Sequence, residues 1–327
     1  MSTIQDPHTA ALIEAAGPLG LNVKDLSEAW GADVIEVSLG DHRELIMDGR
    51  VYSHLSYLSA TFADDKGVSK ALLTGSGLKV PAHHLLDIDL DESIEAQLEG
   101  KMNGETNYVC KPLYGTDGHA VGMNKRDAMD VDMHIEPYTD NYQHWMVEEQ
   151  VEGKDIRIQV IGGQIAAACV REPASVIGDG FSDVEGLIEK HNEKIQALNP
   201  NNKLELDADS RRLMREQSLY LDTVVEAGRK IQLKYISNMG QGGVASDITP
   251  DLHSEYHELV TKVSNAFGFR TFALDGISAD PGLSPFEHLY ALEVNAKAQW
   301  LHHTFSEVRT HDIPTMILRD LFPELNR

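Results

Sequence analysis

A short apolar segment near the C-terminus, residues 290–296, carries two oxygen-bearing side chains at alternate positions, Glu293 and Asn295. Alternate residues of a β-strand project from the same face. An upstream apolar run, residues 272–277, carries one more carboxylate, Asp275. Two carboxylates and an amide oxygen suit Mg²⁺, which takes its remaining ligands from water and substrate phosphates. The pattern therefore favours a sheet in which two strands bring this set to one face.

A second interpretation of the same residues is purely structural. Asp275 could cap a turn, and Glu293 could lie on the solvated half of an edge strand. The two strands alone do not decide between these interpretations, so other parts of the chain have to.

Length and composition indicate a soluble globular protein with room for two or three packed units. The 327 residues are 42% hydrophobic and 24% charged, and no apolar run is long enough to span a bilayer. No charged segment followed by an apolar run opens the sequence, so we expect no secretory signal. Cys110 and Cys169 lie far apart without metal-type spacing, which is typical of a reduced, cytoplasmic protein.

The net charge of −24 argues against binding to nucleic acid or to an anionic membrane. An anionic nucleotide would need locally placed cations. One candidate is Lys111, at the end of an apolar strand that leads into a turn containing Gly115 and Gly118 and then into a second strand. Backbone amides of such a flap can lie over phosphates. Most glycine hairpins bind nothing, however, and this one is not a P-loop because it lacks Gly-Lys-Ser/Thr.

Two arginines lie on either side of a predicted hairpin turn at residues 162–163. If Arg157 and Arg171 lay on one face of the paired strands, they would repel each other unless an anion lay between them. The alternative is that each arginine pairs with one of the many acids. Elsewhere, the patterns predict an acidic amphipathic helix at residues 87–98 and a helix at residues 252–267.

The order of these motifs resembles that of the ATP-grasp carboxylate–amine ligases, most closely the ATP-grasp modules of cyanophycin synthetase and of bifunctional glutathione synthetases. The resemblance runs from about Asp65 to His303. Its most specific parts are residues 151–157, 171–174, 178–180, 238–243, 247–249 and 293–295.

The resemblance implies a role for each matching residue. The nucleotide-binding residues would be Lys66, Lys111, Gly115 and Gly118, a hinge of Glu148, Glu149 and Val151 for adenine, and Asp155 for the ribose. Arg157 and Arg171 would hold the triphosphate and an acyl phosphate, and Asn238 would lie on the substrate side. The magnesium ligands would be Asp275, Glu293 and Asn295, with Mn²⁺ as the alternative ion.

Two departures from the family pattern restrict which properties of the family can be expected of this chain. The flap is poor in glycine and includes Asp117, which weakens the case for phosphate contact. The family often has a proline-containing turn after the position of Asn295, whereas this chain continues without proline through residues 296–303. That region helps to shape the acceptor pocket, so the substrates are not carried over.

The fold that the resemblance implies is α+β, with two α/β lobes clasping ATP. We expect a small N-terminal α/β unit at residues 1–62, an N-lobe with the flap at residues 63–155, and a C-lobe with the metal site at residues 156–327. The implied reaction joins an amino acid or peptide carboxylate to an amine through an acyl phosphate, with release of ADP and phosphate. The family also suggests a homo-oligomer.

Three alternatives to this prediction remain. The chain could be a glutathione synthetase proper, a grasp protein that binds ATP without catalysis, or a generic α/β domain with fortuitous motifs. The complete set of Asp275, Glu293 and Asn295 argues against a mere binder, which could lose its metal ligands without penalty.

Overall fold

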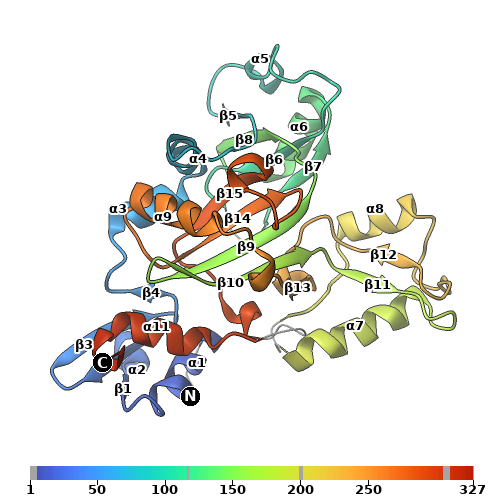
Figure 1. The fold of residues 1–327 in the computed structure, drawn as a ribbon. Coiled ribbons are helices and arrows are strands. Elements are labelled where there is room, and N and C mark those ends of the chain that lie inside the picture. The colour runs from blue at the N-terminus through green and yellow to red at the C-terminus, as the bar shows by residue number, and fades with distance from the viewer. Residues whose placement is uncertain (1–5, 116–117, 199–201, 305–309, 327) are drawn as a thin grey trace. The chain divides into compact units, whose positions relative to one another are not determined.

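A five-stranded sheet with the order β13-β10-β9-β14-β15 is the central feature of the fold (Figure 1). The structure is a computed structural model and describes residues 6–115, 118–198, 202–304 and 310–326. The strands of this sheet are β9 (Lys154–Ile161), β10 (Gln164–Glu172), β13 (Val244–Asp247), β14 (Phe272–Ser278) and β15 (Leu289–Asn295). β14 pairs antiparallel with both β9 and β15.

The turn between β9 and β10 lies where the glycine pair predicted it. Gly162 and Gly163 have φ angles of +60° and +78°, which L-residues with a side chain rarely adopt. Two consecutive residues of this kind form the tight turn that matches the twist of a hairpin.

The chain divides into two compact units. The first comprises Met1–Pro81, Val151–Cys169 and Asp247–Arg327, and the second comprises Ala82–Gln150 and Val170–Ser246. None of the helices within the described residues is both long and apolar enough to cross a membrane.

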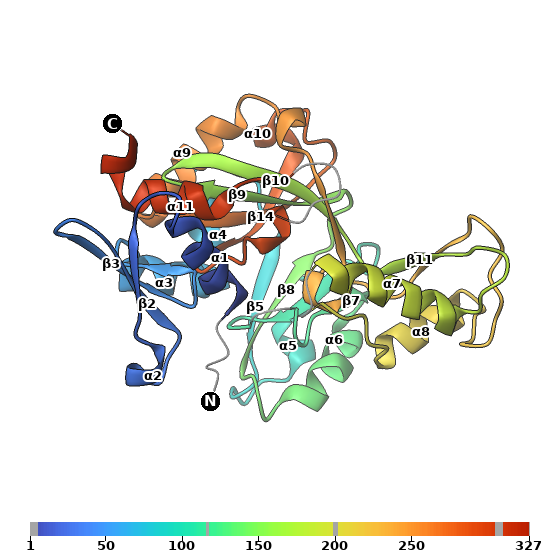
Figure 2. The same ribbon diagram turned by 90° about the horizontal axis from the view of Figure 1, so that it is seen from below.

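The first unit contains a second, four-stranded antiparallel sheet near the N-terminus. Its strands are β1 (Asn22–Asp25), β2 (Val34–Leu39), β3 (His42–Met47) and β4 (Val51–Tyr52). Helices α1 (Pro7–Ala16) and α11 (Ile313–Leu321) lie side by side in both ribbon views and share one apolar core with this sheet (Figure 2). The N-terminal and C-terminal segments of the chain therefore stabilise each other.

Among the described residues, the other α-helices of the first unit are α2 (Ser27–Trp30), α3 (Tyr57–Asp64), α4 (Lys66–Gly75), α9 (Tyr256–Phe267) and α10 (Pro285–His288). The helix predicted at residues 252–267 is present as α9 but begins four residues later, at Tyr256, and it buries Leu259, Val260, Val263 and Phe267 at helical spacing.

The second unit contains two smaller sheets. One has the order β5-β8-β6-β7, with β5 (His83–Asp87), β6 (Tyr108–Pro112), β7 (Gly122–Lys125) and β8 (His144–Glu149), and it shares a core with α5 (Ile94–Gln97) and α6 (Ala128–Ile135). The other pairs β11 (Ser175–Ile177) with β12 (Lys230–Gln232), and its core includes residues of α7 (Val184–Leu198) and α8 (Ala208–Glu216).

The predicted helix at residues 87–98 is wrong. Asp87 ends strand β5, and the only helix in this segment is the short α5, which begins after its N-cap Ser93. The acidic side chains between them form local turns instead: the Asp87 carboxylate accepts a hydrogen bond of 3.0 Å from the amide of Asp89.

Candidate active site

Strand pairing in the first unit aligns three predicted site residues in one row. Asp275 on β14 lies opposite Arg157 on β9 and opposite Glu293 on β15. Directly paired residues share a face of the sheet, so the register itself brings these side chains together. Asn295 is two positions beyond Glu293 and joins the row from the same strand.

Hydrogen bonds connect this row. The Arg157 guanidinium donates from Nε to Asp275 Oδ1 and from Nη2 to Asp275 Oδ2, both at 2.7 Å. The Asn295 amide donates to Asp275 Oδ2 at 3.1 Å and to Glu293 Oε1 at 3.5 Å. We call Arg157, Asp275, Glu293 and Asn295 the carboxylate row.

Burial makes the ion pair in this row sensitive to change. The Asp275 side chain is 3% exposed and that of Arg157 is 12% exposed. Two charges removed from water are stable only when paired with good geometry, which the bidentate bonding provides. The pair therefore holds the row rigidly in place.

The positions of Asp275, Glu293 and Arg157 test the structural alternatives that the sequence left open for them. Asp275 is in the middle of β14 and not at a turn, so the turn-cap alternative is wrong for this residue. Glu293 is half-buried on β15, which is an edge strand of its sheet. Arg157 pairs with an acid, as the alternative for the arginines proposed.

The carboxylate row fits a magnesium ion. An ionised carboxylate has two oxygens with about four lone-pair sites, so the two bonds from Arg157 leave Asp275 able to coordinate a cation. Rotating the Asn295 amide by half a turn would present its oxygen in place of its nitrogen. Glu293 then completes a set made of oxygen atoms, as a hard cation requires.

Two further predicted residues lie in the first unit. Asp155 is half-buried on β9, two positions before Arg157, and therefore projects from the same face. Lys66 is buried at the first position of α4, after its N-cap Asp65.

Sequence reasoning missed Lys70, which is fully buried on α4. Its ammonium group lies 3.5 Å from the backbone carbonyl of Ala291 on β15. Lys66 and Lys70 are four residues apart, so both project from one face of the helix. Two lysines at this spacing on an amphipathic helix were the available signal.

Lys111 and Glu148 form a buried ion pair in the second unit. Lys111 Nζ donates to Glu148 Oε1, and the two residues are 7% and 3% exposed. They lie on β6 and β8, where Val109 pairs with Glu148 and Lys111 pairs with Met146, so they are diagonal neighbours on one face.

The hinge begins at the end of β8. The amide of Glu149 donates to the carbonyl of Ala82 at 2.9 Å, and the amide of Gln150 donates to the carbonyl of Asn107 at 2.8 Å. These two amides are engaged in the sheet, so adenine would have to be bound by other backbone groups of the hinge. Val151, the last predicted hinge residue, begins the next segment of the first unit.

The predicted flap lies between β6 and β7, which pair antiparallel. Gly118 has a φ angle of +71°, and a Cβ atom built on Gly115 would lie 3.2 Å from Pro112 Cβ. Thr116 and Asp117 lie outside the described residues.

Arg171 and Asn238 belong to neighbouring segments of the second unit. Arg171 is half-buried near the end of β10, and Asn238 caps a 3₁₀ turn at Met239–Gln241 by accepting a hydrogen bond of 2.8 Å from the Gly240 amide. A Cβ atom on Gly243 would lie 2.8 Å from the Asn238 carbonyl and 3.0 Å from that of Glu172, next to Arg171. The absence of a side chain at Gly243 therefore lets the two segments approach.

A second buried pair in the first unit was also missed. Asp247 Oδ1 lies 2.6 Å from His311 Nε2 and accepts a hydrogen bond of 2.6 Å from the Thr249 hydroxyl. Burial raises the pKa of the Asp247 carboxyl, but the bonds from Thr249 and His311 outweigh burial, so this pKa lies below its ordinary value. The pair links two chain segments that the sequence separates by 64 residues.

Known proteins resemble this chain over nearly its whole length. It is 28% identical to the glutathione biosynthesis bifunctional protein GshAB of Mannheimia succiniciproducens over 97% of this chain and 42% of that protein. It is also 28% identical to cyanophycin synthetase of Nostoc sp. over 97% of this chain and 35% of that protein. No protein-family model matches the chain.

A solved structure shows the same fold. The crystal structure of a bifunctional glutathione synthetase from Pasteurella multocida superimposes with a TM-score of 0.70 at 24% sequence identity, covering 98% of this chain and 44% of that one. The chain thus spans less than half the length of each of these proteins. Together with the motif order, these similarities confirm the α+β, ATP-grasp fold, and the chain is similar in sequence to glutathione and cyanophycin synthetases.

Proposed function

We propose that the protein is an ATP-dependent ligase that joins an amino acid or peptide carboxylate to an amine, with release of ADP and phosphate. The observation that carries this proposal is the carboxylate row, in which Arg157, Asp275 and Glu293 lie opposite one another on three neighbouring strands. A cation-binding set beside a buried guanidinium suits the stabilisation of a phosphoryl group during transfer.

The proposed reaction has two steps. A carboxylate oxygen of the substrate attacks the γ-phosphorus of ATP, and the bond to the β-phosphate oxygen breaks to give an acyl phosphate and ADP. The amine nitrogen then attacks the acyl carbon, the resulting tetrahedral intermediate expels phosphate, and the nitrogen loses a proton. Both steps develop negative charge on oxygens, so positioned cations lower their barriers.

The chain's own residues have distinct proposed roles in this reaction. Arg157 orients Asp275 and provides positive charge for the transferred phosphoryl group, Arg171 binds the acyl phosphate, and Asn238 lies on the substrate side. Asp275, Glu293 and Asn295 would hold magnesium, which neutralises phosphate oxygens when bound. No covalent nucleophile is needed, so neither cysteine is required for catalysis.

The nucleotide would be bound by the remaining residues. Lys66 and Lys111 provide positive charge for the phosphates, with Gly115 and Gly118 placing flap amides nearby. Glu148 fixes Lys111 through their buried ion pair. The carbonyl of Glu149 and the backbone of Val151 would bind adenine, and Asp155 would accept hydrogen bonds from the ribose hydroxyls.

The proposed substrates are amino acids and short peptides, as the names of the relatives suggest. Residues 296–303 depart from the family pattern in a region that helps to shape the acceptor pocket, so the individual substrates of the relatives are not assigned to this chain. Cys110 and Cys169, both among the described residues, form no disulfide bond, in keeping with a reducing compartment, and we propose a cytoplasmic location. We also propose a homo-oligomer, as is common in the family.

The test is a screen for ATP-dependent phosphate release over pairs of amino acids and dipeptides, with mass detection of products. The expected result is one ADP and one phosphate for each product, whose mass equals that of the two substrates minus one water. Glutathione among the products would identify a glutathione synthetase proper. ATP binding without turnover over all pairs would instead support the non-catalytic alternative.

A further inference from the structure

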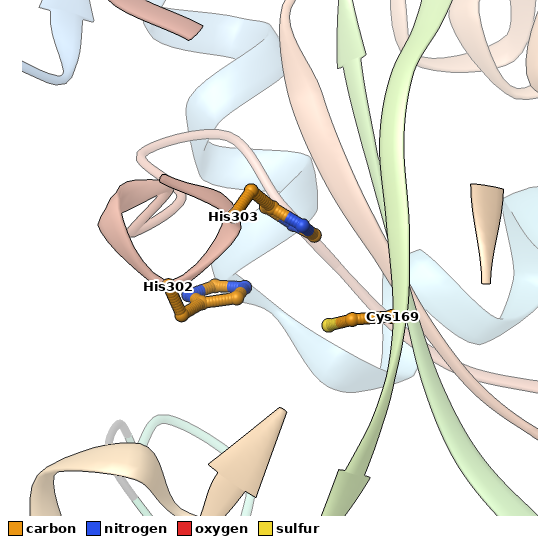
Figure 3. Close-up of side chains that lie close together, drawn as sticks. All are labelled: Cys169, His302 and His303. Carbon is orange, nitrogen blue, oxygen red and sulfur yellow. The ribbon is translucent and has the colours of Figure 1, made fainter. Parts of the chain in front are cut away.

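Three nitrogen- and sulfur-bearing side chains converge in the first unit, and none of them belongs to the carboxylate row. Cys169 lies on β10, and His302 and His303 lie on the short 3₁₀ helix η4 (Leu301–His303). One potential ligand atom from each residue lies within 4.8 Å of the others. Figure 3 shows the cysteine side chain extending from its strand toward the two imidazole rings.

Backbone and side-chain hydrogen bonds hold the strand side of this cluster. The amide of Ala168, which precedes Cys169, donates to the Thr249 hydroxyl at 2.9 Å. The carbonyl of Ala168 accepts from the amide of Ile248, also at 2.9 Å. The position of Cys169 is therefore fixed by the segment at residues 247–249.

The same segment holds the histidine side of the cluster. The His303 carbonyl accepts a hydrogen bond of 3.0 Å from the His311 amide. The His311 ring in turn lies 2.6 Å from the carboxylate of Asp247. Residues 247–249 therefore connect Cys169 and His303 through hydrogen bonds and fix their relative positions. Groups that hydrogen-bond to metal ligands commonly fix the ligands in this way.

The cluster is buried, and its donor atoms are of the kinds that transition metals bind. Cys169 and His303 are both 2% exposed, and the Nε2 atoms of both histidines are inaccessible to solvent. A thiolate and imidazoles are ligands of zinc and similar transition metals, whereas magnesium requires oxygen. The cluster and the carboxylate row would therefore select different ions.

The spacing of the cluster is close to what a zinc site requires. Zinc–sulfur bonds of about 2.3 Å and zinc–nitrogen bonds of about 2.0–2.1 Å place tetrahedral ligand atoms roughly 3.3–3.8 Å apart. The observed limit of 4.8 Å exceeds this by about 1 Å. A small rotation of the side chains closes this gap, and three protein ligands leave a fourth position open.

We propose that Cys169, His302 and His303 bind one divalent transition-metal ion of the zinc class, at a site separate from the magnesium ligands. This proposal does not depend on the ligase activity, because it rests only on the geometry of the cluster and on the hydrogen bonds that hold it. Binding would replace the thiol proton of Cys169 with the metal ion.

The first experiment titrates the untagged 327-residue chain with Co²⁺ in buffer containing excess Mg²⁺. The expected result is one equivalent of bound cobalt, with a thiolate-to-cobalt charge-transfer absorption in the near ultraviolet. Cys169→Ser should remove this absorption and weaken cobalt binding at least about tenfold. Cys110→Ser is the matched control, because burial raises the pKa of Cys110 to about 12 and that thiol lies in the other unit.

A second measurement needs no variant and so does not depend on how Cys169→Ser folds. X-ray absorption of the zinc-loaded wild-type protein should show one sulfur at about 2.3 Å and at least two nitrogens at about 2.0–2.1 Å. A shell without sulfur would overturn the proposal. So would the absence of a charge-transfer band, or a band lost in Cys110→Ser but retained in Cys169→Ser.

Discussion

The Arg157 guanidinium and the Asp275 carboxylate face each other across β9 and β14 through two parallel hydrogen bonds of 2.7 Å. The two residues are 118 positions apart in the sequence, and strand register alone makes them neighbours. A planar guanidinium fits both oxygens of a carboxylate at once, so this pair orients the predicted metal ligand as well as neutralising it.

Arg157→Lys should therefore lower activity although it keeps the charge. Lysine is a point charge and cannot reproduce the two parallel bonds to Asp275. Turnover should fall by about tenfold or more, corresponding to ~1.4 kcal/mol of lost transition-state stabilisation. Arg171→Lys should show a loss of similar size if that residue binds the acyl phosphate.

The measurement for both arginines is steady-state turnover beside the thermal midpoint. Arg43→Lys is the matched control, because the Arg43 side chain is 68% exposed and lies 3.8 Å from Glu36. Such surface pairs contribute under about 1 kcal/mol, so this variant should retain activity. Unchanged turnover in Arg157→Lys and Arg171→Lys would remove both arginines from the mechanism.

Glu293→Gln should abolish turnover and leave the fold intact. A neutral amide holds a divalent cation less strongly than a carboxylate does, and Glu293 is only half-buried, so little packing is lost. Isothermal titration with Mg²⁺ and a non-hydrolysable ATP analogue, alongside circular dichroism, separates metal loss from unfolding. The control is Glu287→Gln, an exposed residue on α10, and near-normal turnover in Glu293→Gln would contradict the metal assignment.

Gly276→Ala should destabilise the carboxylate row through the backbone. A Cβ atom at this position would lie 2.6 Å from Leu289 Cδ1 and 2.9 Å from the Tyr290 carbonyl, at the register shift beside Asp275. Such overpacking costs about 1–3 kcal/mol and would push β15 away from β14. Urea denaturation measures the cost. Gly282→Ala is the control because its Cβ would meet nothing closer than 3.4 Å, and equal stability of the two variants would contradict this account.

His8 should make stability depend on pH near neutrality. Burial lowers its pKa below the ordinary value of 6.5, an effect that its bond to Asp6 only partly offsets. The folded protein thus binds the proton less readily than the unfolded chain. The stabilisation is complete above pH 6.5 and declines as the pH falls below that value toward the folded pKa.

The corresponding experiment compares wild type and His8→Gln by urea denaturation between pH 8 and pH 5. The free energy of unfolding should fall more steeply in the wild type as the medium is acidified. The variant also loses the bond in which His8 Nε2 accepts from the Trp300 amide at 3.3 Å, so the slope and not the absolute stability is the readout. His257→Gln, on the exposed face of α9, should retain the wild-type slope, and equal slopes in all three proteins would contradict the assignment.

Local patterns predicted the parts of the fold that depend on local geometry. The alternation of Glu293 and Asn295 follows from the two-residue period of a strand, and the Gly162-Gly163 turn follows from its backbone requirement. The helix predicted at residues 87–98 is wrong because carboxylates in this acidic segment form turns that compete with a helix.

Features that depend on register or on distant segments were not predictable in this way. The pairing of Arg157 with Asp275 requires the alignment of β9 with β14. The cluster of Cys169 with His302 and His303 has no sequence spacing that would reveal it, because two separate segments bring it together. The spacing of Lys66 and Lys70 places both on one face of α4, but the burial of Lys70 depends on the position of that helix against β15.

Transfer of ¹⁸O from the substrate carboxylate to phosphate is the signature of an acyl phosphate intermediate. A carboxylate substrate found by the screen is labelled at both oxygens, and the released phosphate and the amide are analysed by mass spectrometry. We expect one ¹⁸O in each phosphate and one in each amide, with no transfer in Glu293→Gln. Label in AMP, or phosphate free of label while the amide forms, would contradict it.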